Sequence, residues 1–312
     1  MPRRPRLAVI VAAFVALGLQ GSATPQQPPG YLGAIRWTMA DPRFGGFSAI
    51  EVSSDGSSFT ALNDKGAFVE GHLRRAPDGT IAAIDVGPMR LLKSKEQKPL
   101  AKGRNDSEGM AIAADGTVYV SFEGVARVLR YGRITGVAEN LPTPVAFKSL
   151  PHNAALESLA IDSAGALYTI PEELPESKRI RFLTGQRGNA NGADFPVWRF
   201  ADGTWTQPFN LPRDGVFLPV AADFGPDGRL YVLERAFHGI AGFSSRVRSF
   251  KVGQKALSDS RTHLQTPAGF HDNLEGLSAW RDGTGAIRLT MVSDDNFMPF
   301  QHTEIVEYRL AD

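Results

Sequence analysis

Acidic residues recur at two fixed places around pairs of apolar runs in this sequence. One acid stands at the start of the first run, and a second acid follows the end of the next run. The three complete pairs are Glu108 with Glu123, Glu157 with Glu172, and Glu275 with Asp294. A buried carboxylate costs free energy unless it meets water, a hydrogen-bond donor or a cation. The repetition therefore predicts a shared carboxylate site.

The turns between these runs predict how the acids are arranged in space. Turns such as ADG, SAG and RDG are typical of β-hairpins, because glycine adopts the positive φ of a tight turn. In an antiparallel hairpin the start of the first strand lies beside the end of the second, away from the turn. If the first strand of every hairpin lines one axis, the pairs converge on one mouth, where Asp64 of the first hairpin joins them.

Converging carboxylates suit a hard divalent cation, because Ca²⁺ takes six to eight oxygen ligands. We predict that Ca²⁺ or another divalent metal is held by Glu108, Glu123, Glu157, Glu172, Glu275, Asp294 and Asp64. In the loops that lead to this mouth, Arg104, Lys148 and His152 are expected to provide donors for an anionic ligand. An alternative stays open, in which the acids cap backbone groups or pair with an arginine of the neighbouring repeat.

The same hairpins define the fold class. Five blocks begin near residues 47, 107, 156, 219 and 274, and third and usually fourth apolar runs follow them. Repeats of about 50 residues fit the four-stranded blades of a β-propeller. We predict an all-β propeller of five blades in one domain, residues 31–312, or of six blades if residues 174–218 contain a degenerate blade. The last block has three runs, and residues 31–39 are expected to close the ring as its fourth strand.

The N-terminus has the pattern of a secretory signal peptide. MPRRPR is followed by an apolar run over residues 7–19 and by small residues up to Ala23. That run is too short for a membrane span, which needs about 20 residues. We expect cleavage near Ala23, a periplasmic or secreted protein without a stable membrane span, and a disordered linker over residues 24–30.

The composition excludes several classes of function. The chain has 34 basic and 33 acidic residues, and loss of three arginines with the signal leaves 31 against 33, a net charge of about −2. No nucleic-acid partner is therefore expected. There is no cysteine, which excludes disulfides and thiolate chemistry. The sequence also lacks the GxSxG, HExxH, P-loop and dinucleotide-binding motifs.

Three of the blocks resemble a known family. They are GRNDSEGMAIAADGTVYVSFEG (103–124), NAALESLAIDSAGALYTIPEE (153–173) and DNLEGLSAWRDGTGAIRLTMVSDDN (272–296). They are similar to the repeated blocks of the phytase-like family, also described as esterase-like activity of phytase, over about residues 31–310. The resemblance implies an exported β-propeller that hydrolyses phosphoesters or other esters. Ser48 and Val220 replace the acid in the first and fourth blocks, which argues against a complete multi-metal phytase site.

Two functions follow as hypotheses. The first is a metal-dependent hydrolase of a small anionic or ester substrate. Its expected catalytic residues are Glu108, Glu157, Glu275, Arg104, Lys148 and His152. The second is a non-catalytic propeller that binds a ligand or partner at the same mouth. A lactonase-like propeller with a single axial metal lies between these two.

Overall fold

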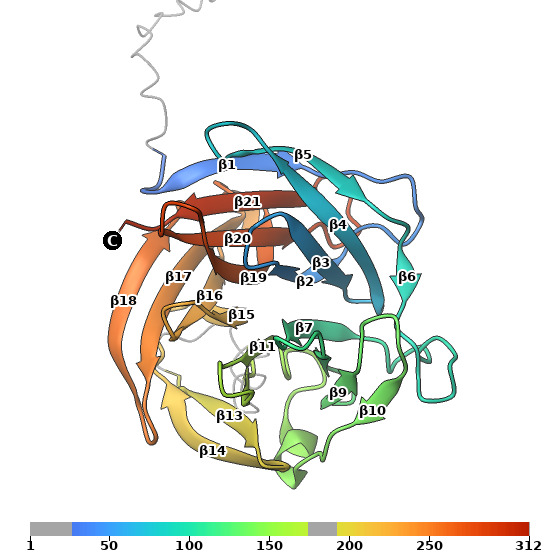
Figure 1. Cartoon of the computed structure of the whole chain (residues 1–312). Coiled ribbons are helices and arrows are strands. Elements are labelled where there is room, and N and C mark those ends of the chain that lie inside the picture. The colour runs from blue at the N-terminus through green and yellow to red at the C-terminus, as the bar shows by residue number, and fades with distance from the viewer. Residues whose placement is uncertain (1–26, 174–191, 312) are drawn as a thin grey trace, which may run out of the picture.

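The repeated turns fold as tight hairpins with glycine at positive φ. These glycines are Gly56, Gly116, Gly165, Gly228 and Gly285, whose φ values lie between 71° and 93°. In the last hairpin the positive φ falls on Gly285 and not, as the RDG turn predicted, on Gly283. The computed structural model describes residues 27–173 and 192–311. Within these residues the strands form five separate antiparallel sheets, which are arranged as blades around one axis (Figure 1). The prediction of an all-β propeller with five blades is confirmed.

The blades follow one another along the chain. Blade 1 contains β2 (Phe47–Val52), β3 (Ser58–Asn63), β4 (Ala67–Arg75), β5 (Ile81–Val86) and the short β6 (Arg90–Leu91). Blade 2 contains β7 (Ser107–Ile112), β8 (Val118–Phe122), β9 (Arg127–Tyr131) and β10 (Ala138–Asn140). Blade 3 contains β11 (Ser158–Ile161), β12 (Leu167–Ile170), β13 (Phe195–Ala201) and β14 (Thr204–Leu211). Blade 4 contains β15 (Leu218–Phe224), β16 (Arg229–Phe237), β17 (Phe243–Val252) and β18 (Leu257–Gln265). Blade 5 contains β19 (Asn273–Arg281), β20 (Ile287–Asp294), β21 (Glu304–Arg309) and the N-terminal β1 (Tyr31–Arg36).

The segment that raised the alternative of a sixth blade belongs to blade 3. Strands β13 and β14 pair with each other, and β13 pairs with β12. Residues 174–191 of this segment lie outside the described residues. Among the described residues this segment therefore completes the four strands of blade 3 and does not form a sixth blade.

The ring closes where the two ends of the chain meet. Strand β1 pairs antiparallel with β21, and Ala34 lies opposite Val306. Just before β1, the carbonyl of Gly30 accepts a hydrogen bond from Arg309 N at 2.8 Å. Residues 27–30, the end of the segment expected to be disordered, thus lead directly into a paired strand. Residues 1–26, with the predicted signal peptide, lie outside the described residues.

The hydrophobic core lies between neighbouring blades. Five clusters of buried apolar residues are found among the described residues, and each combines side chains from two adjacent blades. The inner strands β2, β7, β11, β15 and β19 contact one another in turn around the axis. This packing holds the ring together without disulfides. The described helices are the two short 3-10 turns η1 (Val145–Ser149) and η2 (Gly239–Ala241), and neither is long enough to span a membrane.

Candidate metal centre

The inner strands carry β-bulges near their first residues. In four of the five described inner strands, the pairing with the second strand of the blade is interrupted by a register shift. The residues at these shifts include Ser48, Glu108, Val220 and Glu275. In blade 3, Glu157 stands directly before β11. A bulge re-aims the extra residue and interrupts the regular alternation of side chains. At Glu108 and Glu275 the repeated acid therefore coincides with a bulge at one mouth of the ring, whereas Ser48 and Val220 occupy the bulges of the two blades that lack the acid.

A glycine follows the acid where neighbouring inner strands approach most closely. A Cβ atom on Gly109 would lie 2.7 Å from the backbone nitrogen of Leu159 in the next inner strand. A Cβ atom on Gly276 would lie 2.9 Å from the nitrogen of Ile50. Contacts this short do not occur with a real side chain, so the Glu-Gly motif combines the bulge with tight packing of the ring.

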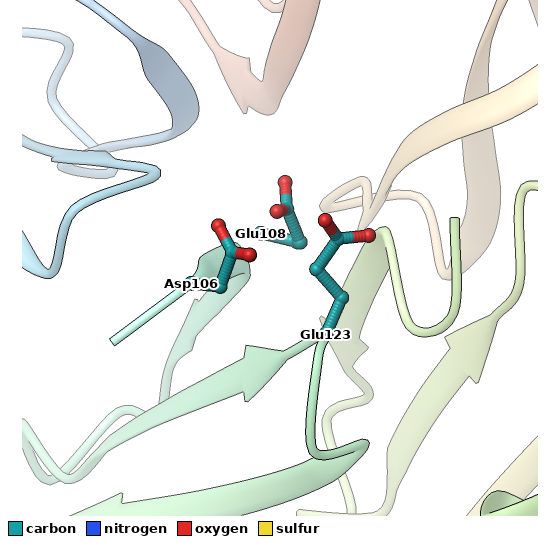
Figure 2. Close-up of side chains that lie close together, drawn as sticks. All are labelled: Asp106, Glu108 and Glu123. Atoms are coloured by element: carbon teal, nitrogen blue, oxygen red, sulfur yellow. The ribbon is translucent and has the colours of Figure 1, made fainter. Parts of the chain in front are cut away.

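Three carboxylates of blade 2 converge at this mouth, which we call the loop mouth because it lies opposite the hairpin turns. One oxygen from each of Asp106, Glu108 and Glu123 can be chosen so that the three lie within 4.8 Å of one another. Figure 2 shows the three carboxyl groups turned toward a common space. Asp106 comes from the loop before β7, Glu108 from β7, and Glu123 follows β8. We call these residues the acidic triad.

The electrostatics of the triad favour a cation. Burial raises the pKa of Glu108 well above its usual range, and the nearby charges of Glu157 and Glu123 raise it further. Burial likewise raises the pKa of Glu157, with contributions from Glu172 and Glu123. Like charges and desolvation both oppose ionisation, and a bound cation would remove that penalty.

Two acids from other blades extend the cluster. Burial raises the pKa of Asp64 to about 7, and Asp294 and Asp106 contribute to the shift. One buried oxygen of Asp64, Oδ1, has no hydrogen-bond partner among the described residues. Asp294 accepts a hydrogen bond from Asn296 N at 2.6 Å, yet burial raises the pKa of Asp294 to about 6. Carboxylate oxygens with this little compensation are candidate ligands.

Arg235 on β16 binds the two remaining predicted acids. Its Nη2 lies 2.9 Å from Glu172 Oε1, and its Nη1 forms an ion pair with Glu275. The same Nη1 donates to Asn273 Oδ1 at 2.6 Å. Glu172 and Glu275 are thus compensated by an arginine of a neighbouring blade, as the alternative interpretation of the repeated acids expected. Their role as metal ligands stays a prediction.

The three predicted basic residues have different surroundings. Arg104 and Lys148 are exposed, and no ion pair joins either of them to the acids among the described residues. His152 is also exposed, but its charge favours ionisation of Asp106 and lowers the pKa of that group against the effect of burial. Of the three, His152 is the best placed to act at the triad.

The sequence analysis missed a second acidic pair at the opposite mouth, which we call the turn mouth. Glu51 near the end of β2 and Asp223 near the end of β15 interact, and burial raises the pKa of Asp223 to about 7. Asp223 Oδ2 accepts a hydrogen bond from Ala279 N at 2.7 Å. In the sequence, the acids that interrupt the apolar runs FSAIEV and PVAADF could have indicated this pair.

Comparison with known proteins identifies a family for this architecture. The family model Phytase-like, described as esterase-like activity of phytase, matches residues 42–297. No curated protein matched the sequence.

Solved structures match this chain at low sequence identity. The α-L-arabinofuranosidase of Podospora anserina, solved with cellotriose, is 15% identical with a TM-score of 0.51, and the match covers 91% of this chain and 99% of that one. The PQQ-bound aldose sugar dehydrogenase of Streptomyces coelicolor is 12% identical with a TM-score of 0.49, covering 91% and 100% of the two chains. The match to the arabinofuranosidase shows a shared fold alone.

Proposed function

The chain belongs to the phytase-like family, and from this membership and the acidic triad we propose that it is a metal-dependent hydrolase of phosphoester or carboxylic ester substrates. The observation that carries the proposal is the convergence of Asp106, Glu108 and Glu123 within 4.8 Å at the loop mouth. Three carboxylates so close together, with raised pKa values, fit a divalent cation better than they fit an empty protein site.

The donor set indicates which residues would hold the metal. The triad supplies oxygens from one blade, and Asp64 has an oxygen without a protein partner. Carboxylate oxygens are the ligands that Ca²⁺ takes in proteins. When bound, such a metal polarises a substrate oxygen and makes a water molecule more acidic. The described residues contain a single triad of this kind, which favours one metal over several and brings the lactonase-like arrangement close to the proposal.

The protein groups around the triad would orient the ligands and the substrate. Ala154 N donates to Glu123 Oε2 at 2.5 Å and fixes the direction of that carboxylate. Arg235 holds Glu172 and Glu275 beside Glu157 and reduces the negative charge on that side of the mouth. His152 lies near Asp106, where it could bind an anionic group of the substrate.

Hydrolysis of simple esters by the full chain tests this proposal. We expect 4-nitrophenyl phosphate or 4-nitrophenyl acetate to be hydrolysed with Ca²⁺ or another divalent metal, and chelation to abolish the activity. Glu108→Gln with Glu157→Gln should lower turnover at least about 100-fold, as removal of key catalytic groups does. Glu139→Gln on β10, whose side chain is 61% exposed, is the matched control.

Two outcomes would contradict this proposal, the first for the site and the second for the hydrolase activity. Metal-dependent activity that survives in the folded double variant would exclude the triad as the catalytic site. No hydrolysis by the wild-type chain with any divalent metal would leave the non-catalytic binding propeller.

The expected location of the protein is a separate proposal. Its support is the sequence pattern of residues 1–23, with a basic start, an apolar run and small residues before the cut. Cell fractionation followed by N-terminal sequencing should find a chain beginning near Thr24 outside the cytoplasm. A full-length chain in the cytoplasmic fraction would contradict it.

A further inference from the structure

A large hollow lies beside the acidic cluster, between blades 4 and 5. Its volume is about 970 Å³, within the range of small-molecule sites. The walls come from the β16–β17 connection with η2, the loop before β19, and the loop between β20 and β21. We call it the blade 4–5 pocket.

Part of the wall of this pocket is apolar and exposed. Phe237 and Phe300 line it, and 55% and 75% of their surfaces are exposed. Met298 and Ile240 also line it and are exposed. The rings of Phe237 and Phe243 are 5.0 Å apart and form one continuous wall. Exposed apolar side chains gathered around a hollow mark a binding surface more often than isolated ones do.

The pocket is continuous with the acidic cluster through two residues. Glu172 and Arg235 line the pocket, and Arg235 also forms the ion pair with Glu275. The guanidinium of Arg235 lies 5.9 Å from the centre of the Phe243 ring, where the charged mouth meets the apolar wall. A molecule in the pocket would therefore have one end at the loop mouth.

The charge of the lining opposes a polyanionic ligand. Arg235 is the only arginine or lysine among the described lining residues, and two carboxylates already compensate it. The lining also includes three acids, Glu172, Asp272 and Glu304. Both lining histidines lie against these acids: His271 is 3.5 Å from Glu304, and His302 is 3.2 Å from Asp272 and 3.7 Å from Glu304. This lining would repel several phosphate groups at once.

We propose that the substrate is an uncharged carboxylic ester whose bulky apolar acyl group occupies the blade 4–5 pocket while its ester group lies at the loop mouth. This inference rests on the proposed hydrolase function. In the reaction, water adds to the acyl carbon, the bond between that carbon and the alcohol oxygen breaks, and a proton from water ends on the leaving alcohol. The products are a carboxylic acid and an alcohol, and no oxidant or reductant is needed.

The first test measures binding without turnover. The probe is 4-phenylbutan-2-one, a neutral ketone with an apolar ring and no cleavable ester, observed with the full chain by saturation-transfer NMR. Ala241→Trp should fill the pocket from η2 and weaken binding at least about tenfold. Val145→Trp is the matched control, because Val145 is 79% exposed on η1 and does not line the pocket.

The second test measures turnover of 4-nitrophenyl esters with acyl chains from acetyl to octanoyl. Each added methylene should raise kcat/KM roughly twofold to fourfold in the wild type, because burial of apolar surface contributes to binding. This gain should disappear in Ala241→Trp and persist in Val145→Trp.

The outcomes separate this inference from the proposed function. If the wild type binds the ketone and Ala241→Trp, but not Val145→Trp, removes this binding, the proposed pocket is supported even if no ester is hydrolysed. Hydrolysis that depends on Glu108 but not on acyl chain length, with no ketone binding, would overturn the pocket and leave the hydrolase standing. Tighter binding of inositol hexakisphosphate than of the ketone, abolished by Ala241→Trp, would also overturn it.

Discussion

The two mouths of the ring both hold carboxylates with raised pKa values, but the protein compensates them differently. At the turn mouth, Glu51 and Asp223 form one pair, and donors such as Ala279 N and the hydroxyl of Ser278 reach their oxygens. A shared proton is enough to neutralise such a pair. At the loop mouth, acids arrive from four blades: Asp64, Asp106, Glu108, Glu123, Glu157, Glu172, Glu275 and Asp294.

The loop mouth has more negative charge than its protein donors compensate. Within the part of the chain that the structure describes, Arg235 binds Glu172 and Glu275 but not the acidic triad, and Asp64 Oδ1 has no hydrogen-bond partner. A raised pKa alone therefore does not distinguish a structural pair from a ligand site. The number of acids and the supply of hydrogen-bond donors distinguish the two mouths, and they support the proposal that the cation binds at the loop mouth.

Removal of Arg235 should have the largest effect on stability. Arg235→Gln leaves Glu172 and Glu275 without their cation in a buried position, so we expect a loss of about 3–5 kcal/mol in the free energy of unfolding. Urea unfolding of the metal-free protein measures this loss. Saturating Ca²⁺ should restore part of it, and an unchanged midpoint would show that the mouth is not held by this arginine.

Asp223→Asn should instead increase the free energy of unfolding at neutral and higher pH. Because the pKa of Asp223 is raised to about 7 in the folded protein, folding retains a proton that the unfolded chain releases near pH 4. Stability is therefore greatest below that pH and falls as the pH rises toward 7.

The asparagine variant should lose the part of this slope that Asp223 causes, while burial still raises the pKa of Glu51. At pH 8 it should be more stable than the wild type by on the order of 2–4 kcal/mol, since each pKa unit corresponds to about 1.4 kcal/mol. Thermal unfolding between pH 4 and pH 8 measures the effect. A variant as pH-dependent as the wild type would contradict the assignment of the turn-mouth pair, and its Ca²⁺ binding should be unchanged.

The smallest expected effect concerns the bulge that directs Glu108 to the loop mouth. Gly109→Ala would place a Cβ 2.7 Å from Leu159 N, so it should destabilise the protein by about 1–3 kcal/mol and weaken metal binding. Gly132→Ala is the control, because nothing lies within 4 Å of its Cβ position. Equal effects of the two substitutions would mean that the close approach of the inner strands is unimportant.

Much of this architecture could be predicted from the sequence. The Asp-Gly and Ala-Gly turns, the repeat spacing and the three-run last block predicted five blades and a ring closed by residues 31–39. The position of Glu108 beside Glu123 followed from hairpin geometry, because residues that flank one hairpin are close in sequence and in space.

The other features depend on contacts between distant segments. Arg235 meets Glu172 from 63 residues away, and no local pattern indicates that pairing. Asp106 was not part of the predicted metal set, because it lies in a loop and a loop residue has no fixed register. The blade 4–5 pocket is built from three connections that have no shared motif.

Calorimetric titration of Ca²⁺ into the chelator-stripped protein, residues 24–312, would show directly whether the loop mouth binds a cation. We expect binding at micromolar concentration or tighter. Glu108→Gln with Glu157→Gln should abolish this binding, while Asp223→Asn should retain it. Absence of Ca²⁺ binding, or binding that the turn-mouth variant loses and the loop-mouth variant keeps, would contradict the assignment of the cation to the loop mouth.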